Sequence, residues 1–277
     1  MQNFKLNEKD ILTNPDWTFP TKIAYGTGRL KEIGHICKNL DIKNPLIVTD
    51  KGSNKLPFII NLQKYLNSSN VKSDLFFDIS PNPREDEVSV GCKKYKDGNH
   101  DSIIAIGGGS AMDGGKLICL TANNNVPLRN FEFELTPPKI SKDNPFPKII
   151  TIPTTAGTGA ETEITAMVTY LKEGMKFCMW HPDVRPSLAL IDPELTIGLP
   201  SNLTAWTGAD ALIHGIEGYC VPGFNPMCDG AALEGLSLIS KSLITAVEEP
   251  SNLLARSGMH VGSCLAGISF LKGLVLV

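Results

Sequence analysis

The chain has 277 residues, of which 42% are hydrophobic and 20% charged, and this globular composition is long enough for one large or two modest domains. Its 26 lysines and arginines against 29 aspartates and glutamates give a formal net charge of −3. Because no long basic run is present, we expect no nucleic-acid partner. The seven cysteines are odd in number and never spaced as Cys-x-x-Cys, so neither a disulfide framework nor a thiolate zinc site is indicated.

The N-terminal segment carries charges every few residues and lacks the apolar core of a signal peptide. No apolar stretch approaches the roughly 18 residues that a membrane helix needs. These features predict a soluble, cytoplasmic protein with reduced thiols and no membrane partner.

Between residues 45 and 200, short apolar runs alternate with longer stretches of helical period, which indicates strands joined by crossover helices in a parallel sheet. Each run contains β-branched or aromatic residues and leads into a turn signal. Ligands in such sheets bind at the carboxyl ends of the strands. The predicted strands are 45–49, 73–77, 102–106, 148–152 and 188–191.

After Pro200 the strand signals stop, and the periodicity predicts amphipathic or mostly buried helices. These predicted helices are 202–219, 227–247 and 253–270. We therefore expect an α/β domain over residues 1–195 and an all-helical domain over residues 196–277.

A glycine-rich turn follows the predicted strand 102–106, in the run Gly107-Gly-Gly-Ser-Ala-Met-Asp-Gly-Gly-Lys116. Glycines allow close approach of a ligand, and free N–H groups at the start of a helix bind anions such as phosphate. The run fits neither a P-loop, because Ser110 and Leu117 stand at two required positions, nor the common dinucleotide pattern, because Met112 replaces a glycine. A turn without any ligand is the alternative.

A second turn, Pro153-Thr-Thr-Ala-Gly-Thr-Gly-Ala-Glu161, places three hydroxyls and two glycines after strand 148–152. Hydroxyls and amides can bind a ribose, an amide or a phosphate, although such residues also cap their own backbone.

In the first predicted helix after Pro200, Asp210 and His214 are four residues apart, and Glu217 lies three further on. Residues at this spacing share one face of a helix, where a carboxylate and an imidazole can bind one divalent cation. A simple surface pair is the alternative. The other histidines are weaker candidates.

Taken together and in this order, these runs and Asp192-Pro-Glu-Leu195 resemble the iron-containing (group III) alcohol dehydrogenase family. The resemblance implies a Rossmann-like nucleotide domain followed by a helical metal domain, in a dehydroquinate synthase-like architecture. It also implies NAD(P)-linked interconversion of small alcohols with aldehydes or ketones.

The resemblance assigns roles residue by residue. Gly108, Gly109 and Ser110 would hold the pyrophosphate and Asp113 would lie near the nicotinamide ribose. The remaining cofactor contacts would be Asp50 at the adenosine ribose, Asn82, Thr154, Thr155, Thr158 and Lys176, the last as a ribose contact. Asp210 and His214 would be metal ligands and thereby catalytic, with Fe²⁺ expected and Zn²⁺ as the alternative. Because Asp50 would repel a 2′-phosphate, we expect NAD rather than NADP.

The sequence departs from the family after Ala266-Gly-Ile-Ser-Phe-Leu-Lys-Gly-Leu274, because the run ends at Val277 where the family places a third ligand, a histidine. We expect a C-terminally truncated chain that lacks two ligand histidines and has impaired activity. A catalytically inactive dinucleotide-binding protein, a glycerol dehydrogenase-like enzyme and a dehydroquinate synthase-like lyase are the alternatives. The alcohol and the oligomeric state stay open, with a homo-oligomer as one outcome.

Overall fold

The computed structural model describes residues 21–272, and its centre is a six-stranded sheet in the order β1-β8-β5-β4-β2-β3. All pairs in this sheet are parallel. Its strands are β1 (Ile23–Tyr25), β2 (Pro45–Asp50), β3 (Asp74–Ile79), β4 (Ser102–Gly107), β5 (Lys148–Pro153) and β8 (Leu188–Ile191).

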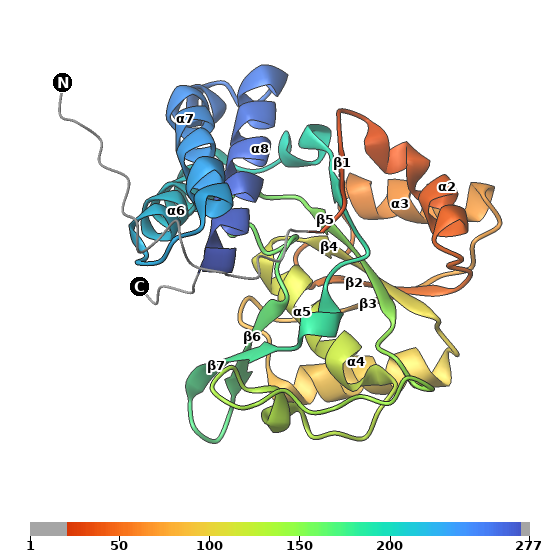
Figure 1. Ribbon diagram of the computed structural model, residues 1–277. Helices are drawn as coiled ribbons and strands as arrows, with labels where there is room; N and C mark the ends of the chain where they lie inside the picture. The colour runs from red at the N-terminus through yellow and green to blue at the C-terminus, as the bar shows by residue number, and fades with distance from the viewer. Residues whose placement is uncertain (1–20, 273–277) are drawn as a thin grey trace.

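Helices cover both faces of the sheet (Figure 1). They are α2 (Ile33–Asn39) and α3 (Pro57–Ser68) on one face, and α4 (Glu85–Asp97) and α5 (Gly109–Ala122) on the other. Successive strand residues point to opposite faces. Leu46 and Ile103 accordingly pack in the core under α4 and α5, while Ile47 and Ile104 pack in the core under α2 and α3. Burial on both faces explains why β2 and β4 are continuous apolar runs.

The five predicted strands are present, each matching within two residues of its predicted end. Two features were not predicted from the sequence: β1, which is only three residues long, and an antiparallel hairpin of β6 (Thr165–Tyr170) and β7 (Met175–Trp180). The hairpin pairs Thr165 with Trp180 and Tyr170 with Met175. Short 3₁₀ helices lie between these elements, at Arg29–Glu32, Leu128–Phe131, Pro182–Val184 and Pro193–Thr196.

The helical region contains α6 (Ser201–Cys220), α7 (Pro226–Glu248) and α8 (Leu253–Ser269), followed by a 3₁₀ turn at Phe270–Lys272. Small residues allow close packing: a Cβ at Gly208 would lie 2.3 Å from Leu243 Cδ1, and one at Gly262 would lie 3.1 Å from the Gly235 carbonyl oxygen. Within residues 21–272, α7 is long and apolar enough to cross a membrane, judged by length and composition alone. This is weak evidence for a membrane-spanning helix, because core helices of soluble proteins pass the same test.

The helical region packs against the sheet region through α8. Gly159, in the loop after β5, has a positive φ of 67° and lies so close to α8 that a Cβ would be 2.5 Å from Gly267 Cα. Glycine is therefore required on both sides of this contact. The division at residues 195 and 196 stays a prediction, although the last strand ends at Ile191 and α6 begins at Ser201.

Candidate functional site

The glycine turn connects the buried strand β4 to the start of α5. Gly107 has a φ of 145°, which favours glycine, and its carbonyl oxygen accepts a 2.9 Å hydrogen bond from the Thr154 backbone N–H. Gly108 is the N-cap of α5 and Gly109 its first residue. The turn is thus locked to the neighbouring β5 loop, and the start of α5 faces the carboxyl edge of the sheet, where α/β proteins bind ligands.

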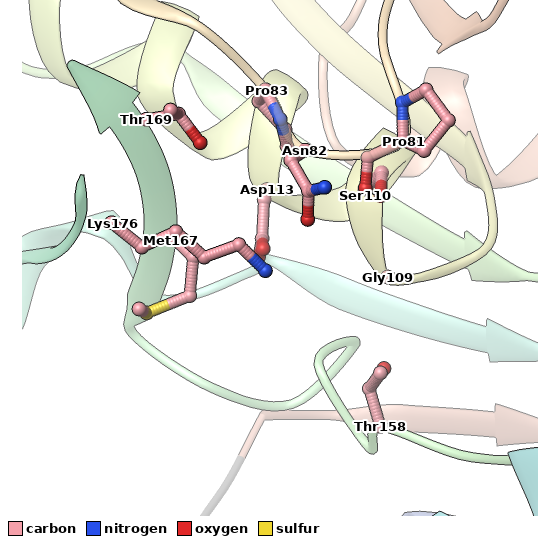
Figure 2. Close-up of a pocket in the computed structure, with 10 residues that line it drawn as sticks. All are labelled: Pro81, Asn82, Pro83, Gly109, Ser110, Asp113, Thr158, Met167, Thr169 and Lys176. Atoms are coloured by element: carbon pink, nitrogen blue, oxygen red, sulfur yellow. Dashed lines mark hydrogen bonds between the residues drawn. The ribbon is translucent and has the colours of Figure 1, made fainter. Parts of the chain in front are cut away.

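A cavity of about 230 Å³ opens beside this turn (Figure 2). Its walls come from the loop after β3, the start of α5, the loop after β5 and the β6–β7 hairpin. Six residues predicted from the sequence line it together: Asn82, Gly109, Ser110, Asp113, Thr158 and Lys176. The other lining residues are Pro81, Pro83, Met167 and Thr169.

The four other predicted cofactor residues lie around the glycine turn but do not line this cavity. Asp50 ends β2, and a Cβ at Gly107 would lie 3.2 Å from its Oδ2. The Asp50 carboxylate accepts hydrogen bonds from the Ser53 N–H at 3.0 Å and from the Ser53 hydroxyl at 2.7 Å. A Cβ at Gly108 would lie 3.5 Å from Thr155 Cγ2, and the Thr154 backbone binds Gly107. The predicted set therefore surrounds one turn.

Asp113 is the acidic group in the cavity wall. Burial raises its pKa to about 6, while the nearby Lys116 and Lys176 ammonium groups act in the opposite direction. Figure 2 shows the Lys176 ammonium beside the Asp113 carboxylate. The cavity thus combines backbone donors at a helix start with hydroxyls, an amide, a carboxylate and an ammonium, which is the range of groups that a dinucleotide uses.

Behind the cavity wall lies a group of charged residues for which the sequence predicts no role. It consists of the buried Lys116 and Glu161 and the half-buried Glu163, beside Asp113. Burial raises the pKa of Glu161 and of Glu163 to about 7 and lowers that of Lys116. The only available signal in the sequence was a set of charges inside two otherwise apolar or small-residue runs.

The predicted metal pair lies on α6. His214 Nε2 is 3.3 Å from Asp210 Oδ1, and the His214 ring packs edge-on against Phe270 at 4.8 Å between centroids. His214 Nδ1 is buried without a hydrogen-bond partner. An imidazole nitrogen and a carboxylate oxygen so placed suit Fe²⁺ or Zn²⁺. Within residues 21–272, no group of three or more His, Cys, Asp and Glu side chains could hold a metal.

A second, apolar cavity of about 230 Å³ lies next to this pair. Phe270, which contacts His214, is part of its wall, and Glu163 supplies an ionisable group. Its remaining lining residues are Phe133, Ile164, Thr165, Trp180 and Leu271. Glu163 therefore lies between this cavity and the buried charges behind the first one.

The structure combines a parallel sheet that helices cover on both faces with a glycine turn that opens a helix at the carboxyl edge of the sheet, and a helical region with an Asp–His pair follows. This combination is that of the dehydroquinate synthase-like class of α/β proteins. The N-terminal part, residues 20–193, matches the model of iron-containing alcohol dehydrogenases. Residues 204–275 match the model of the C-terminal part of the same family. The chain belongs to the iron-containing alcohol dehydrogenase family.

Curated relatives agree. Alcohol dehydrogenase 4 of Saccharomyces cerevisiae is 35% identical over 89% of this chain and 63% of its own length. The 1,3-propanediol dehydrogenase of Citrobacter freundii is 34% identical over 92% of this chain and 65% of its own length. The chain thus spans a little under two thirds of the length of these relatives.

Solved structures show the same fold. A crystal structure of a 1,3-propanediol oxidoreductase superposes with a TM-score of 0.87 at 34% identity, covering 93% of this chain and 66% of that chain. A sulfoacetaldehyde reductase from Bifidobacterium kashiwanohense, solved in complex with NAD⁺, superposes with a TM-score of 0.85 at 32% identity, covering 94% of this chain and 68% of that chain. The predicted family and fold class are confirmed, whereas the individual site residues stay predictions.

Proposed function

We propose that this chain is the nucleotide-binding part, with a portion of the metal-binding part, of an NAD-linked alcohol dehydrogenase. The observation that carries the proposal is the first cavity, where six residues predicted from separate motifs line one space at the start of α5. A relative solved in complex with NAD⁺ and a relative named as an NAD-dependent methanol dehydrogenase support NAD as the cofactor.

In this proposal, the chain's residues bind and orient the dinucleotide. The N–H groups of Gly109 and Ser110 at the start of α5 bind the pyrophosphate. Thr158 closes the opposite wall, and Asp113 and Lys176 lie on the nicotinamide ribose side. Asp50 accepts hydrogen bonds from the adenosine ribose, because its carboxylate is at the carboxyl end of β2 beside the glycine turn.

The metal pair and the apolar cavity form the alcohol side of the proposed site. A divalent metal, when bound, supplies a Lewis acid that lowers the pKa of the alcohol hydroxyl. Asp210 and His214 would hold it, since His214 presents nitrogen donors next to the carboxylate. Phe270 and Trp180 provide an apolar wall that excludes water around a small carbon chain. Small alcohols and diols are the proposed substrates, in keeping with relatives named for methanol and 1,3-propanediol.

A second candidate is a dinucleotide-binding protein without turnover. It is favoured by the observation that the described residues offer only two side chains for the metal. Catalytic metal sites usually have at least three protein ligands, so we propose weak metal binding and impaired activity where residues 21–272 are the only source of ligands. A cytoplasmic location is also proposed, supported by the absence of disulfides among the seven cysteines.

Titration of NADH fluorescence tests the dinucleotide site. Replacing Gly109 with Val places a Cβ 2.8 Å from Thr158 Cγ2 and crowds the pyrophosphate position, so we expect NADH affinity to fall by about tenfold or more. Gly198→Ala is the matched control, because a Cβ there meets no atom within 4 Å. Equal affinity in wild type and Gly109→Val would refute the proposed site. Addition of Zn²⁺ and short alcohols with NAD⁺ then separates the enzyme from the non-catalytic binder.

A further inference from the structure

The buried lysine behind the first cavity contacts two of the segments that shape it. Lys116 is fully buried one turn after Asp113 on α5. Its Nζ donates hydrogen bonds to the Ala160 carbonyl at 2.5 Å and to the Thr165 carbonyl at 2.9 Å. Ala160 belongs to the hydroxyl-rich loop after β5, and Thr165 is the first residue of β6. One ammonium group therefore joins three elements.

Each of the two segments that Lys116 binds also supplies residues to the wall of the first cavity. The Ala160 N–H donates to the Thr158 hydroxyl at 3.3 Å, so the residue whose carbonyl oxygen Lys116 binds also contacts Thr158 through its N–H. Thr158 in turn packs on Gly109, where an added Cβ would lie 2.8 Å from Thr158 Cγ2. Beyond Thr165, β6 supplies Met167 and Thr169 to the opposite side of the cavity. The spacing between α5, the loop and β6 thus depends on where the Lys116 ammonium lies.

Acidic side chains surround the Lys116 ammonium and compensate its charge. A buried ammonium is costly unless it is paired and hydrogen-bonded. Asp113 on α5 and Glu161 and Glu163 on the loop supply the opposite charge, and Cys178 on β7 also faces Lys116. Glu163 accepts a hydrogen bond from the Thr165 hydroxyl at 2.8 Å. The position of the Lys116 ammonium is thus fixed by two hydrogen bonds to carbonyl oxygens and by the surrounding carboxyl groups.

We propose that Lys116 is a positioning residue for the dinucleotide site: its two hydrogen bonds to the Ala160 and Thr165 carbonyls hold the Thr158 loop and β6 at the spacing from α5 that the cofactor needs. Lys116 does not line the cavity, so it acts through Thr158 and the hairpin. The inference rests on the proposed function, because the cofactor assignment of the cavity comes from there.

The test compares Lys116→Met with Lys148→Met. Lys148 also donates one hydrogen bond to a carbonyl, that of Leu40, but is exposed at the opposite end of β5 from the hydroxyl-rich loop. We expect Lys116→Met to weaken NADH binding about tenfold and to speed amide hydrogen exchange in residues 154–165, while exchange in β2 and β4 stays slow. Lys148→Met should change neither. Unchanged NADH affinity and loop exchange in a folded Lys116→Met protein would overturn the proposal.

A double variant separates positioning from charge compensation. Lys116→Met leaves buried carboxyls unpaired and lowers stability, so Lys116→Met/Glu161→Gln should recover much of the melting temperature without recovering NADH affinity or slow loop exchange. If the double variant recovers all three, Lys116 only neutralises charge and the proposal is wrong. The exchange measurement requires no cofactor. Should the wild type fail to bind NADH, the proposed function falls, while faster loop exchange in the double variant would still support the contact made by Lys116.

Discussion

At the scale of single residues, we propose that Asp50 selects between NAD and NADP. Its carboxylate is held by the Ser53 N–H and hydroxyl at the end of β2. A ribose 2′-hydroxyl can donate to this carboxylate, whereas a 2′-phosphate would be repelled by it. We expect the wild type to bind NAD at least about tenfold more tightly than NADP, and Asp50→Gly to reduce the ratio to about threefold or less.

Calorimetric titration of both dinucleotides into both proteins measures this ratio. Asp78→Gly is the control, since Asp78 is an exposed carboxylate on the adjacent strand β3. If the wild type binds NADP as tightly as NAD, Asp50 does not contact the ribose.

The metal pair gives a second prediction at this scale. In the proposed site Asp210 and His214 are the two metal ligands that residues 21–272 supply, so we expect Zn²⁺ to bind no more tightly than roughly micromolar, and Asp210→Ala to abolish that binding. Equilibrium dialysis measures it, with the exposed Glu234→Ala on α7 as control. Nanomolar affinity that survives Asp210→Ala would place the metal elsewhere.

The residues whose position at the cavity could be predicted from the sequence belong mostly to one local run. Gly109, Ser110 and Asp113 follow a strand within a few residues, and their placement depends only on the strand-to-helix turn. Lys116 and Glu161 could not be predicted, because charged residues are usually exposed and only packing between separate elements buries them.

At the scale of elements, α6 has one face of small residues and other faces that carry large apolar side chains. The face of small residues packs against α7 and α8, and it consists of Thr204, Gly208, Ala211, Gly215 and Gly218. On other sides, large apolar side chains are exposed: Trp206 is 65% exposed, and Ile213 and Ile216 are 44% exposed each. Ile244 of α7 and Leu254 of α8 are exposed as well.

Exposed apolar surface of this kind favours association. We expect the chain to self-associate with rising concentration, and Trp206→Glu/Ile213→Glu to reduce the average mass measured by light scattering during gel filtration. Ser240→Glu adds the same kind of charge at an exposed polar position of α7 and should have little effect. A monomeric wild type at high concentration would contradict the expectation.

Helices whose apolar residues recur at a regular spacing could be predicted from the sequence, whereas strands without a regular apolar pattern could not. The helices α6, α7 and α8 match their predicted ranges within one residue at each end, because their apolar and small residues recur at helical spacing. The hairpin of β6 and β7 was missed because Thr165, Thr169 and Lys176 interrupt its apolar pattern, and its pairing partners are chosen by packing on α5 and the 3₁₀ turn at Leu128–Phe131.

At the scale of the whole molecule, the contact between the sheet region and α8 contains a buried carboxyl. Glu161 follows the Gly159 contact with Gly267, and its carboxyl lies near the thiol of Cys264 on α8. Glu161 Oε1 is buried without a hydrogen-bond partner. The sequence could place both segments in their own elements, but the pairing of a loop with a helix about 100 residues later follows only from the three-dimensional packing.

This carboxyl makes the stability of the molecule depend on pH. The pKa of Glu161 is about 7 in the folded protein, against an ordinary value of 4.5, because burial disfavours the charged form. Below about pH 4.5 the carboxyl is protonated in both states and adds no penalty. Between pH 4.5 and 7 the folded state binds the extra proton, so the free energy of unfolding falls as pH rises through this window.

We therefore expect Glu161 to make the protein less stable to urea at pH 8.0 than at pH 5.5 by roughly 1 kcal/mol or more, with Glu163, whose pKa is also raised to about 7, adding in the same direction. His260 acts in the opposite direction, because burial lowers its pKa to about 3, so the quantity to measure is the difference in pH dependence between the wild type and Glu161→Gln. Carboxyls with lowered pKa, such as Glu32 and Asp86, oppose the trend only weakly because they are exposed. Glu161→Gln cannot ionise and should flatten the dependence, whereas Glu234→Gln on the exposed face of α7 should leave it unchanged. The same pH dependence in Glu161→Gln as in the wild type would show that the carboxyl between the sheet region and α8 is not what titrates.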